Sequence, residues 1–226
     1  MRARQGEASK IMILIWKVVA SFVIGSIPFA KIAMLGTGID ITKVGSKNPG
    51  FRNVSRVASK WRAAVTLLGD IGKGYVALQL LGRGEPSSAA LWILGIAAVM
   101  GHCWSPFLGF NGGKGVATTV GVLLRREPLI AIACTPLYWL LRYIGGKFHW
   151  RQEGAIASLA TMLLMSNVVL ALRGLESGFF AYVMLAIVVF RHGSNLREIM
   201  ASKHGSPSAG QKSRSADVQA APRQSR

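Results

Sequence analysis

Three polar, glycine-containing segments hold most of the side chains in this sequence that could bind an anion or orient a proton. They are DITKVGSKNPGFRNVSR (residues 40–56), GFNGGKGVATTVG (109–121) and FRHGSNLR (190–197). Hydroxyl, amide and guanidinium groups within glycine-rich turns are the donors that hold a phosphate or a carboxylate. The segments therefore predict an anion-binding site assembled from distant parts of the chain.

In the first segment, the candidate ligands are Ser46, Asn48, Asn53 and Arg56. No helical or strand period fits residues 40–56, so we expect an irregular loop. The alternative is an ordinary basic loop that only sets membrane topology. For Lys43 and Lys60 this alternative explains the sequence as well as anion binding does. It does not explain why asparagine, serine and glycine accompany the charge.

In the second segment, Gly112, Gly113 and Gly115 surround Lys114 and an apolar helical run follows. Free N–H groups at a helix N-terminus together with one lysine make an anion site. The segment is not a Walker A loop, because glycine follows Lys114 where that motif needs serine or threonine. Glycine used only for helix packing explains Gly121, but it does not explain three glycines around a lysine.

In the third segment, His192 and Asn195 are three residues apart and share one face if the helix continues. The alternative is an Arg191–His192 pair that only complements the helix C-terminus. Ser158, in a separate apolar run, either joins this site or bonds a backbone carbonyl. His192, which is the only obvious side-chain base, Asn195 and Ser158 are therefore candidates for a site role.

Other polar residues within apolar runs favour structural roles. Asp70 and Lys73 are three apart, so we expect them to neutralise one another. His102 is read as a framing residue beside a turn. The two cysteines, Cys103 and Cys134, lie in apolar stretches and are expected to be small buried apolar residues.

The elements that must position these residues are transmembrane helices. Of the 226 residues, 51% are apolar, and 16% are charged, against about 25% in soluble domains. The net charge of +18 would suggest nucleic acid as a partner, but the basic residues lie between long apolar runs, so nucleic acid is excluded. We predict an all-α polytopic membrane protein with about seven transmembrane helices: Ile11–Ala30, Trp61–Leu81, Pro86–Leu108, Gly115–Leu124, Pro128–Leu141, Gly154–Leu172 and Gly174–Phe190.

The distribution of basic residues predicts the orientation of these helices. With the N-terminus outside, the inner segments hold 17 of the 27 lysines and arginines and the outer segments hold 7. All three polar segments then fall on the inner, cytoplasmic side of the membrane. Residues 1–202 are expected to form one membrane domain, and 203–226, poor in large apolar residues, a disordered basic cytoplasmic tail.

Several kinds of chemistry lack the residues they need. The sequence has no HEXXH motif, no clustered cysteine and histidine and no carboxylate pair, so we expect neither a metal nor a cofactor. It also lacks the H-x4-D motif of acyltransferases that depend on CoA or acyl carrier protein. With nine acidic residues, transport through a chain of carboxylates is unsupported.

Six motifs in sequence order resemble the bacterial membrane family of acyl-phosphate:glycerol-3-phosphate acyltransferases, the PlsY type. GSIPFAK (25–31) comes first, and GSKNPGFRNVSR (45–56) is similar to the family's GSGNxGATNVxR. DIGKG (70–74), GHCWSPFLGFNGGKGVATTVG (101–121), SLATM (158–162) and RHGSN (191–195) follow, matching DxxKG, GH…FxGGKGVAT, SLxSI and RHxxN. The resemblance covers residues 25–200.

This resemblance implies transfer of a fatty acyl group from acyl phosphate to the 1-hydroxyl of sn-glycerol 3-phosphate, giving lysophosphatidate and phosphate. It implies a cytoplasmic-facing site, membrane lipids as surroundings, and no need for CoA, acyl carrier protein or metal; a monomer is expected. Carried over, Ser46, Arg56 and Lys114 hold phosphate with the glycine N–H groups around Lys114, and Ser158, His192 and Asn195 orient the acceptor and the carbonyl. The family is thought to use the substrate's own phosphate as the base, with His192 as a hydrogen-bonding residue.

The sequence also departs from the family's pattern. Phe51 and Arg52 stand where the family has Ala-Thr, Lys47 where it commonly has glycine, and Glu198 where it usually has arginine. Arg52 and Arg191 are additional candidates for binding phosphate. A divergent paralogue with another acceptor, a small anion channel or transporter, and an inactive binder of lipid headgroups remain alternatives.

Overall fold

The computed structural model describes residues 2–203, and this part of the chain is entirely helical, without a β-strand. The tail expected at 203–226 lies, except for its first residue, outside the described residues. Nine α-helices and one short 3-10 helix make up the described part: α1 (Arg2–Ser26), α2 (Phe29–Ala33), α3 (Phe51–Val57), α4 (Lys60–Leu81), α5 (Ser88–Cys103), η1 (Pro106–Leu108), α6 (Val116–Arg126), α7 (Pro128–Lys147), α8 (Glu153–Arg191) and α9 (Gly193–Lys203).

Each of the seven predicted transmembrane segments lies within or largely overlaps a helix, but only four helical segments are long and apolar enough to cross a membrane by themselves. These are Gln5–Ala33, Ser88–Leu108, Pro128–Lys147 and Glu153–Arg191. Helix α4 has sufficient length, but it carries several charged residues, including Asp70 and Lys73, and α6 has only 11 residues. Length and composition therefore do not by themselves test whether α4 and α6 cross the membrane.

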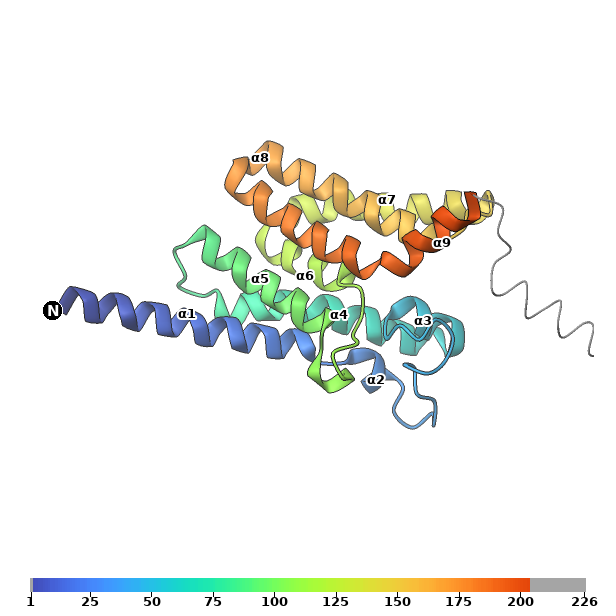
Figure 1. Cartoon of the computed structure of the whole chain (residues 1–226), viewed down its shortest axis with the longest axis horizontal. Coiled ribbons are helices and arrows are strands. Elements are labelled where there is room, and N and C mark those ends of the chain that lie inside the picture. Colours follow the sequence, from blue (N-terminus) through green and yellow to red (C-terminus); the bar gives the residue numbers. More distant parts are fainter. Residues whose placement is uncertain (1, 204–226) are drawn as a thin grey trace, which may run out of the picture.

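Helix α8 corresponds to two of the predicted segments. Its 39 residues are interrupted at Gly174, whose φ of 78° and ψ of −175° are not helical. Because glycine has no Cβ, it adopts this conformation without the strain another residue would bear. The chain turns back at Gly174, so α8 forms a helical hairpin (Figure 1).

Close helix packing depends on glycine at the crossing of α4 and α6. A Cβ on Gly121 would lie 1.9 Å from the carbonyl oxygen of Ile71, and a Cβ on Gly74 would lie 2.3 Å from that of Thr118. Each glycine therefore faces the other helix's backbone, as small residues do where membrane helices approach closely. The packing role expected for Gly121 is confirmed.

The prediction of an irregular loop over residues 40–56 was wrong for its last part. Residues 51–57 form α3, whose Val54 is fully buried beside Ile41 and Met34 in a small second core. The amphipathic run is too short for helical periodicity to show in the sequence. As a result, a helix rather than a flexible loop carries Arg52, Asn53 and Arg56.

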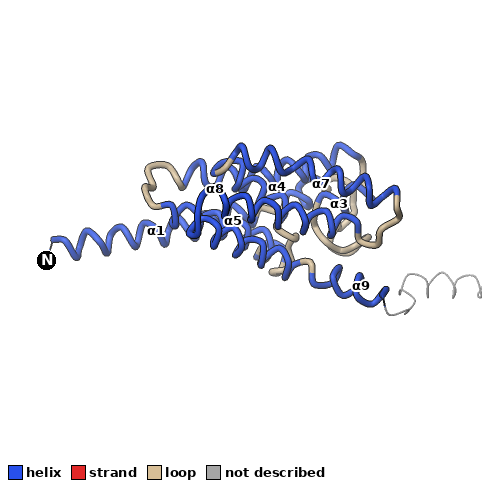
Figure 2. The backbone as a smooth tube through the Cα atoms, turned by 90° about the horizontal axis from the view of Figure 1, so that it is seen from above, coloured by secondary structure: helices blue, strands red, loops and turns tan. Residues whose placement is uncertain are grey.

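The helices form an elongated bundle with two distinct ends. The α5 N-terminus, the α6 C-terminus and the turn at Gly174 lie toward one end, and α3 and α9 lie toward the other (Figure 1). Helix α1 runs along the side of the bundle, and its N-terminal part extends past the other helices (Figures 1 and 2). The larger core, around Trp92, Leu94 and Val122, lies between α4, α5, α6 and α8.

Candidate active site

A cavity of about 1140 Å³ lies at the α3 and α9 end of the bundle. It brings together residues from all three polar segments, although these segments are separated by more than 50 residues in the chain. Ten of the eleven candidates line it: Ser46, Asn48, Asn53, Arg56, Gly112, Lys114, Gly115, Ser158, His192 and Asn195. Gly113 does not. The folded chain therefore places the predicted residues around one space.

Lys114 is held at this cavity by an amide side chain. Its Nζ donates to Oδ1 of Asn195, and Nδ2 of Asn195 in turn donates to Oε1 of Gln152 at 2.6 Å. Burial and, to a lesser extent, the nearby charges of Arg52 and Arg56 lower the pKa of Lys114 to about 8. An anion entering the cavity would relieve this repulsion and favour the protonated amine.

The N-terminus of α6 supplies backbone donors beside Lys114. Gly115 is the N-cap, with a φ of 86°, and no side chain caps the helix there. Val116 and Ala117, the first two residues of α6, line the cavity. The first N–H groups of a helix have no partner within it and attract negative charge. Lys114 and this terminus therefore place a positive charge and free N–H donors where the sequence predicts an anion site.

The structure corrects the role expected for Gly112 and Gly113. Their N–H groups donate to the carbonyl oxygens of Cys103 and His102, both at 3.1 Å, and so do not face a ligand. A Cβ on either residue would lie 2.1 Å from an atom of His102. These glycines therefore allow the loop to lie against the end of α5. Their contacts favour a packing role over the anion-binding role expected from the sequence.

Arg191 stabilises the same glycine loop. Its Nε and Nη2 donate to the carbonyl oxygens of Gly113 and Gly112, at 3.0 and 2.7 Å, and its guanidinium lies over the ring of Trp104. With these partners Arg191 positions the loop that carries Lys114. Phosphate binding, considered for Arg191 from the sequence, is not what its hydrogen bonds indicate.

Asn53 is also a positioning residue rather than a free donor. It is 1% exposed; its Oδ1 accepts from the N–H of Ser46 at 2.9 Å, and its Nδ2 donates to the carbonyls of Ile41 and Val44. All its polar groups are engaged, which fixes the chain that precedes α3. The ligand role expected for Asn53 is therefore corrected.

Three other candidates from the first segment keep their polar side chains free. Within residues 2–203, Ser46, Asn48 and Arg56 make no side-chain hydrogen bond or ion pair. Ser46 and Arg56 are exposed and Asn48 is half-buried, all at the cavity. An anion in the cavity can take their donors without breaking an existing interaction.

His192 is a neutral side chain with one free ring nitrogen. It is 2% exposed, and its Nδ1 lies 2.8 Å from the carbonyl oxygen of Val188. A carbonyl only accepts, so Nδ1 carries the hydrogen and Nε2 has an open lone pair. Burial lowers the pKa of His192 to about 4, and the charges of Lys114 and Arg52 act in the same direction. A substrate hydroxyl close to Nε2 could therefore donate its hydrogen to this nitrogen.

Ser158 combines the two alternatives left open for it. Its hydroxyl donates to the carbonyl of Gly154 at 2.7 Å, and it is 5% exposed at the cavity wall. The hydrogen is already used, but the oxygen lone pairs can still accept a donor.

The pairing expected for Asp70 and Lys73 is confirmed. Lys73 Nζ lies 2.8 Å from Asp70 Oδ1 and donates to the carbonyl of Ile27 at 3.0 Å. Nδ1 of His102 lies 3.4 Å from the same carboxylate oxygen. All three side chains are buried, so this cluster links α4 and α5 to the connection between α1 and α2.

Several cavity residues were missed by sequence reasoning. Gln152 and Glu153 lie in a short connection without a recognisable motif, and they contact Asn195 and Arg52 across the fold. Nothing in their local sequence predicts these contacts, because the partner of each lies more than 40 residues away in the chain.

The apolar wall of the cavity was missed for the same reason: it includes Leu67, Ile71, Val116, Val120, Trp139, Met162 and Val189.

The chain matches the family model described as glycerol-3-phosphate acyltransferase over residues 15–202. Curated relatives with this name include a protein of Neisseria meningitidis serogroup C, 40% identical over 195 residues, covering 83% of this chain and 94% of the relative. Another, from Rubrobacter xylanophilus, is 35% identical over 192 residues, covering 84% and 92%.

Two solved structures are similar over the same extent. Both are crystal structures of PlsY (YgiH), described as an integral membrane glycerol 3-phosphate acyltransferase, one in the glycerol 3-phosphate form and one in the lysophosphatidic acid form. They are 28% identical to this chain with TM-scores of 0.73 and 0.72, covering 84% of it and 92% of their own length. The chain is accordingly an all-α, multi-pass integral membrane protein, and it belongs to the glycerol-3-phosphate acyltransferase family.

Proposed function

We propose that this chain transfers the acyl group of an acyl phosphate to the 1-hydroxyl of sn-glycerol 3-phosphate, giving lysophosphatidate and inorganic phosphate. Glycerol-3-phosphate acyltransferase activity follows from family membership. The proposal adds the donor, the acceptor position and the residues responsible. It requires no metal, CoA or acyl carrier protein.

The composition of the cavity is the observation that carries this proposal. Its lining is divided between cationic side chains, among them Arg52, Arg56 and Lys114, and apolar ones, among them Leu67 and Val120. An acyl phosphate has the same division, a phosphate joined to a long apolar chain. Glycerol 3-phosphate brings a second phosphate, so a site with several cations is needed for both substrates together.

The reaction can proceed mainly by positioning, because acyl phosphate is a mixed anhydride and already activated. The hydroxyl oxygen of glycerol 3-phosphate attacks the carbonyl carbon, the bond from that carbon to the phosphate oxygen breaks, and phosphate leaves with both electrons. The hydroxyl proton passes to a phosphate oxygen of the substrate. Atoms and charge therefore balance without a covalent enzyme intermediate.

Each candidate residue has a role consistent with its surroundings. Lys114 and the α6 N-terminus bind one phosphate, and Arg56, Ser46 and Asn48 contribute the free donors opposite. Nε2 of His192 accepts from the attacking hydroxyl and orients it.

Two further residues complete the proposed site. Asn195 fixes the Lys114 amine through its hydrogen bond, and Ser158 contributes an acceptor oxygen at the cavity wall.

For the membrane arrangement, we propose seven crossings with the N-terminus outside and the cavity and C-terminal tail in the cytoplasm. Helices α4 and α6 would then cross inside the bundle, where contact with other helices compensates for their charge or short length. Residues 1–202 form the membrane domain, 203–226 are a disordered basic tail, and the protein acts as a monomer in a bacterial inner membrane.

The proposal is tested by incubating the purified protein with labelled glycerol 3-phosphate and palmitoyl phosphate. We expect lysophosphatidate and phosphate in equal amounts from the wild type and almost none from Lys114→Ala. Liposomes containing the protein, loaded with labelled phosphate, are assayed in parallel. Absence of lysophosphatidate with rapid phosphate release would favour an anion channel, and turnover of only a different acceptor would favour a divergent paralogue; either result overturns the proposal.

A further inference from the structure

Arg52 is a cavity-lining cation at a position where the family's motif has an uncharged residue. It lies in the first turn of α3, and its side chain is partly buried at the cavity. Sequence similarity cannot supply a role for it, because the related motif has threonine there. The role of Arg52 therefore has to follow from its surroundings in the fold.

The guanidinium of Arg52 is held against α8 by two features. Its Nη2 lies 2.8 Å from Oε1 of Glu153, at the start of α8. The group also occupies the space beside Gly154: a Cβ on Gly154 would lie 2.0 Å from Nη1 and 2.1 Å from Cζ. The guanidinium therefore occupies the space that a side chain at position 154 would fill, and any residue larger than glycine there would displace it.

Most hydrogen-bonding capacity of Arg52 is unused. A guanidinium has five N–H donors, and among the described residues Arg52 uses only one of them, with Glu153. The same oxygen, Oε1 of Glu153, also accepts from Arg142, which does not line the cavity. One carboxylate thus faces two guanidinium groups, and a positive charge with free donors remains directed at the cavity.

Neighbouring cations make an anion at this place favourable. Burial lowers the pKa of Arg52, and the charge of Arg52 is among the causes that lower the pKa of Lys114. Both groups remain cations near neutral pH. Like charges held close together in partly buried surroundings are stabilised by a shared dianion.

We propose that Arg52 is an additional phosphate-binding residue of this site, positioned by Glu153 and by the space beside Gly154. This inference rests on the proposed function, in which both substrates carry a phosphate. The ligand is therefore the phosphate group of acyl phosphate or of glycerol 3-phosphate, and separate measurements for the two substrates distinguish them.

The test compares Arg52→Thr with Arg142→Gln, two variants that each remove one guanidinium from the same oxygen of Glu153. We expect Arg52→Thr to raise KM about 10-fold or more for one phosphate substrate, the usual effect of losing a charged hydrogen bond, with kcat changed much less. Arg142→Gln is expected to leave both KM values near those of the wild type. Arg52→Lys should restore part of the lost affinity.

Gly154→Ala provides a second variant, which keeps the charge of Arg52 but displaces it. We expect the same KM to rise, by less than in Arg52→Thr. Unchanged KM values in Arg52→Thr would overturn the inference. Equal increases in Arg52→Thr and Arg142→Gln would also overturn it, because Arg52 would then act only through Glu153.

Failure of the proposed function is distinguishable from failure of this inference. If the wild type forms no lysophosphatidate, the proposed function fails, and binding of inorganic phosphate by calorimetry then decides the role of Arg52. Weaker phosphate binding in Arg52→Thr but not in Arg142→Gln supports that role. Equal binding in all three proteins refutes it. Melting temperatures in detergent verify that each variant is folded.

Discussion

The two ends of the bundle use basic residues in different ways, and α6 connects them. At its C-terminus, Arg125 donates to Gln79 at 2.6 Å, and Arg126 donates to Ser88 at 2.7 Å while lying over the ring of Trp92. At its N-terminus, Lys114 has an amide partner and lies near other cations.

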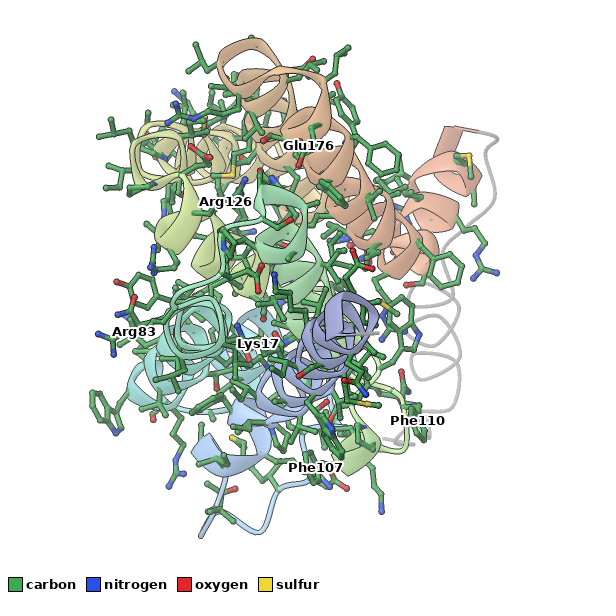
Figure 3. All side chains as sticks on the ribbon, turned by 90° about the vertical axis from the view of Figure 1, so that its left-hand side faces the viewer. Lys17, Arg83, Phe107, Phe110, Arg126 and Glu176 are labelled. Atoms are coloured by element: carbon green, nitrogen blue, oxygen red, sulfur yellow. The ribbon has the colours of Figure 1, made fainter. Side chains whose placement is uncertain are left out.

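The same contrast extends beyond α6. At the Gly174 end, Glu127 is 6% exposed and pairs with Arg173 at 2.7 Å, and Lys17 approaches Glu85 at 3.5 Å. Figure 3 looks onto this end, with Lys17, Arg126 and Glu176 among its labelled residues. At the cavity end, Arg56 has no such partner within the described chain. The paired cations at the Gly174 end join helices to one another, whereas Arg56 and Lys114, which have no carboxylate partner in the described chain, are available to an anionic ligand.

The largest expected effect separates Lys114 from Arg125. Lys114→Ala removes a cation from the anion site, and we expect acyltransferase activity to fall by about 100-fold or more, as when an electrostatic donor of a reaction site is lost. Arg125→Ala removes a surface hydrogen bond at the other end of α6, so activity should remain within about threefold of the wild type. Rates of lysophosphatidate formation by the two folded variants measure this. Similar losses in both would contradict the distinction between the ends.

A smaller effect is expected at His192. The substitution His192→Gln alters the hydrogen bond to the attacking hydroxyl, and kcat should fall about 10- to 100-fold. This loss lies at the low end for general acid–base assistance, because the substrate phosphate and not His192 takes the proton. The measurement is kcat with saturating substrates. A loss far beyond this range would indicate that His192 is the base itself.

The pH dependence of substrate binding reports on Lys114. Its lowered pKa of about 8 means that the amine of the free enzyme is protonated below this pH and loses its charge above it. KM should therefore rise by about 10-fold per pH unit above pH 8, the limit for binding to the protonated form alone. Lys114→Arg, which keeps its charge, should flatten the profile. An unchanged profile in that variant would assign the ionisation to another group.

The smallest effect on activity is expected from Arg173→Gln. Its loss leaves the buried carboxylate of Glu127 without its partner, so stability should decrease by about 1–2 kcal/mol, since Arg173 itself is half-exposed. Activity below the melting temperature should not change. Thermal unfolding in detergent and the rate at low temperature measure the two quantities; a fall in activity without a fall in stability would contradict a structural role for this end.

Much of the fold and of the candidate site could be predicted from the sequence. Long apolar runs predict helices without knowledge of their neighbours, because hydrocarbon requires every backbone group to bond within its own helix. The six motifs identified the family, which the comparisons confirm. Ten of eleven candidates lie at one cavity, although their roles remain proposals. Where the apolar signal is weak, the sequence missed the short helix α3, and length and composition alone leave the crossings of α4 and α6 untested.

The sequence by itself determined the class of protein, the family, and most of the candidate residues that lie at the cavity. Only the tertiary structure decided how those residues are used. Gly112, Gly113 and Asn53 have the types of anion ligands, yet their donors bond backbone carbonyls brought to them by the fold. Arg52 and Glu153 become a pair only because the fold brings the first turn of α3 near the start of α8. A residue's type gives its capacity to donate or accept, but a hydrogen bond needs a partner within about 3 Å, and for these residues the partner comes from a distant part of the chain.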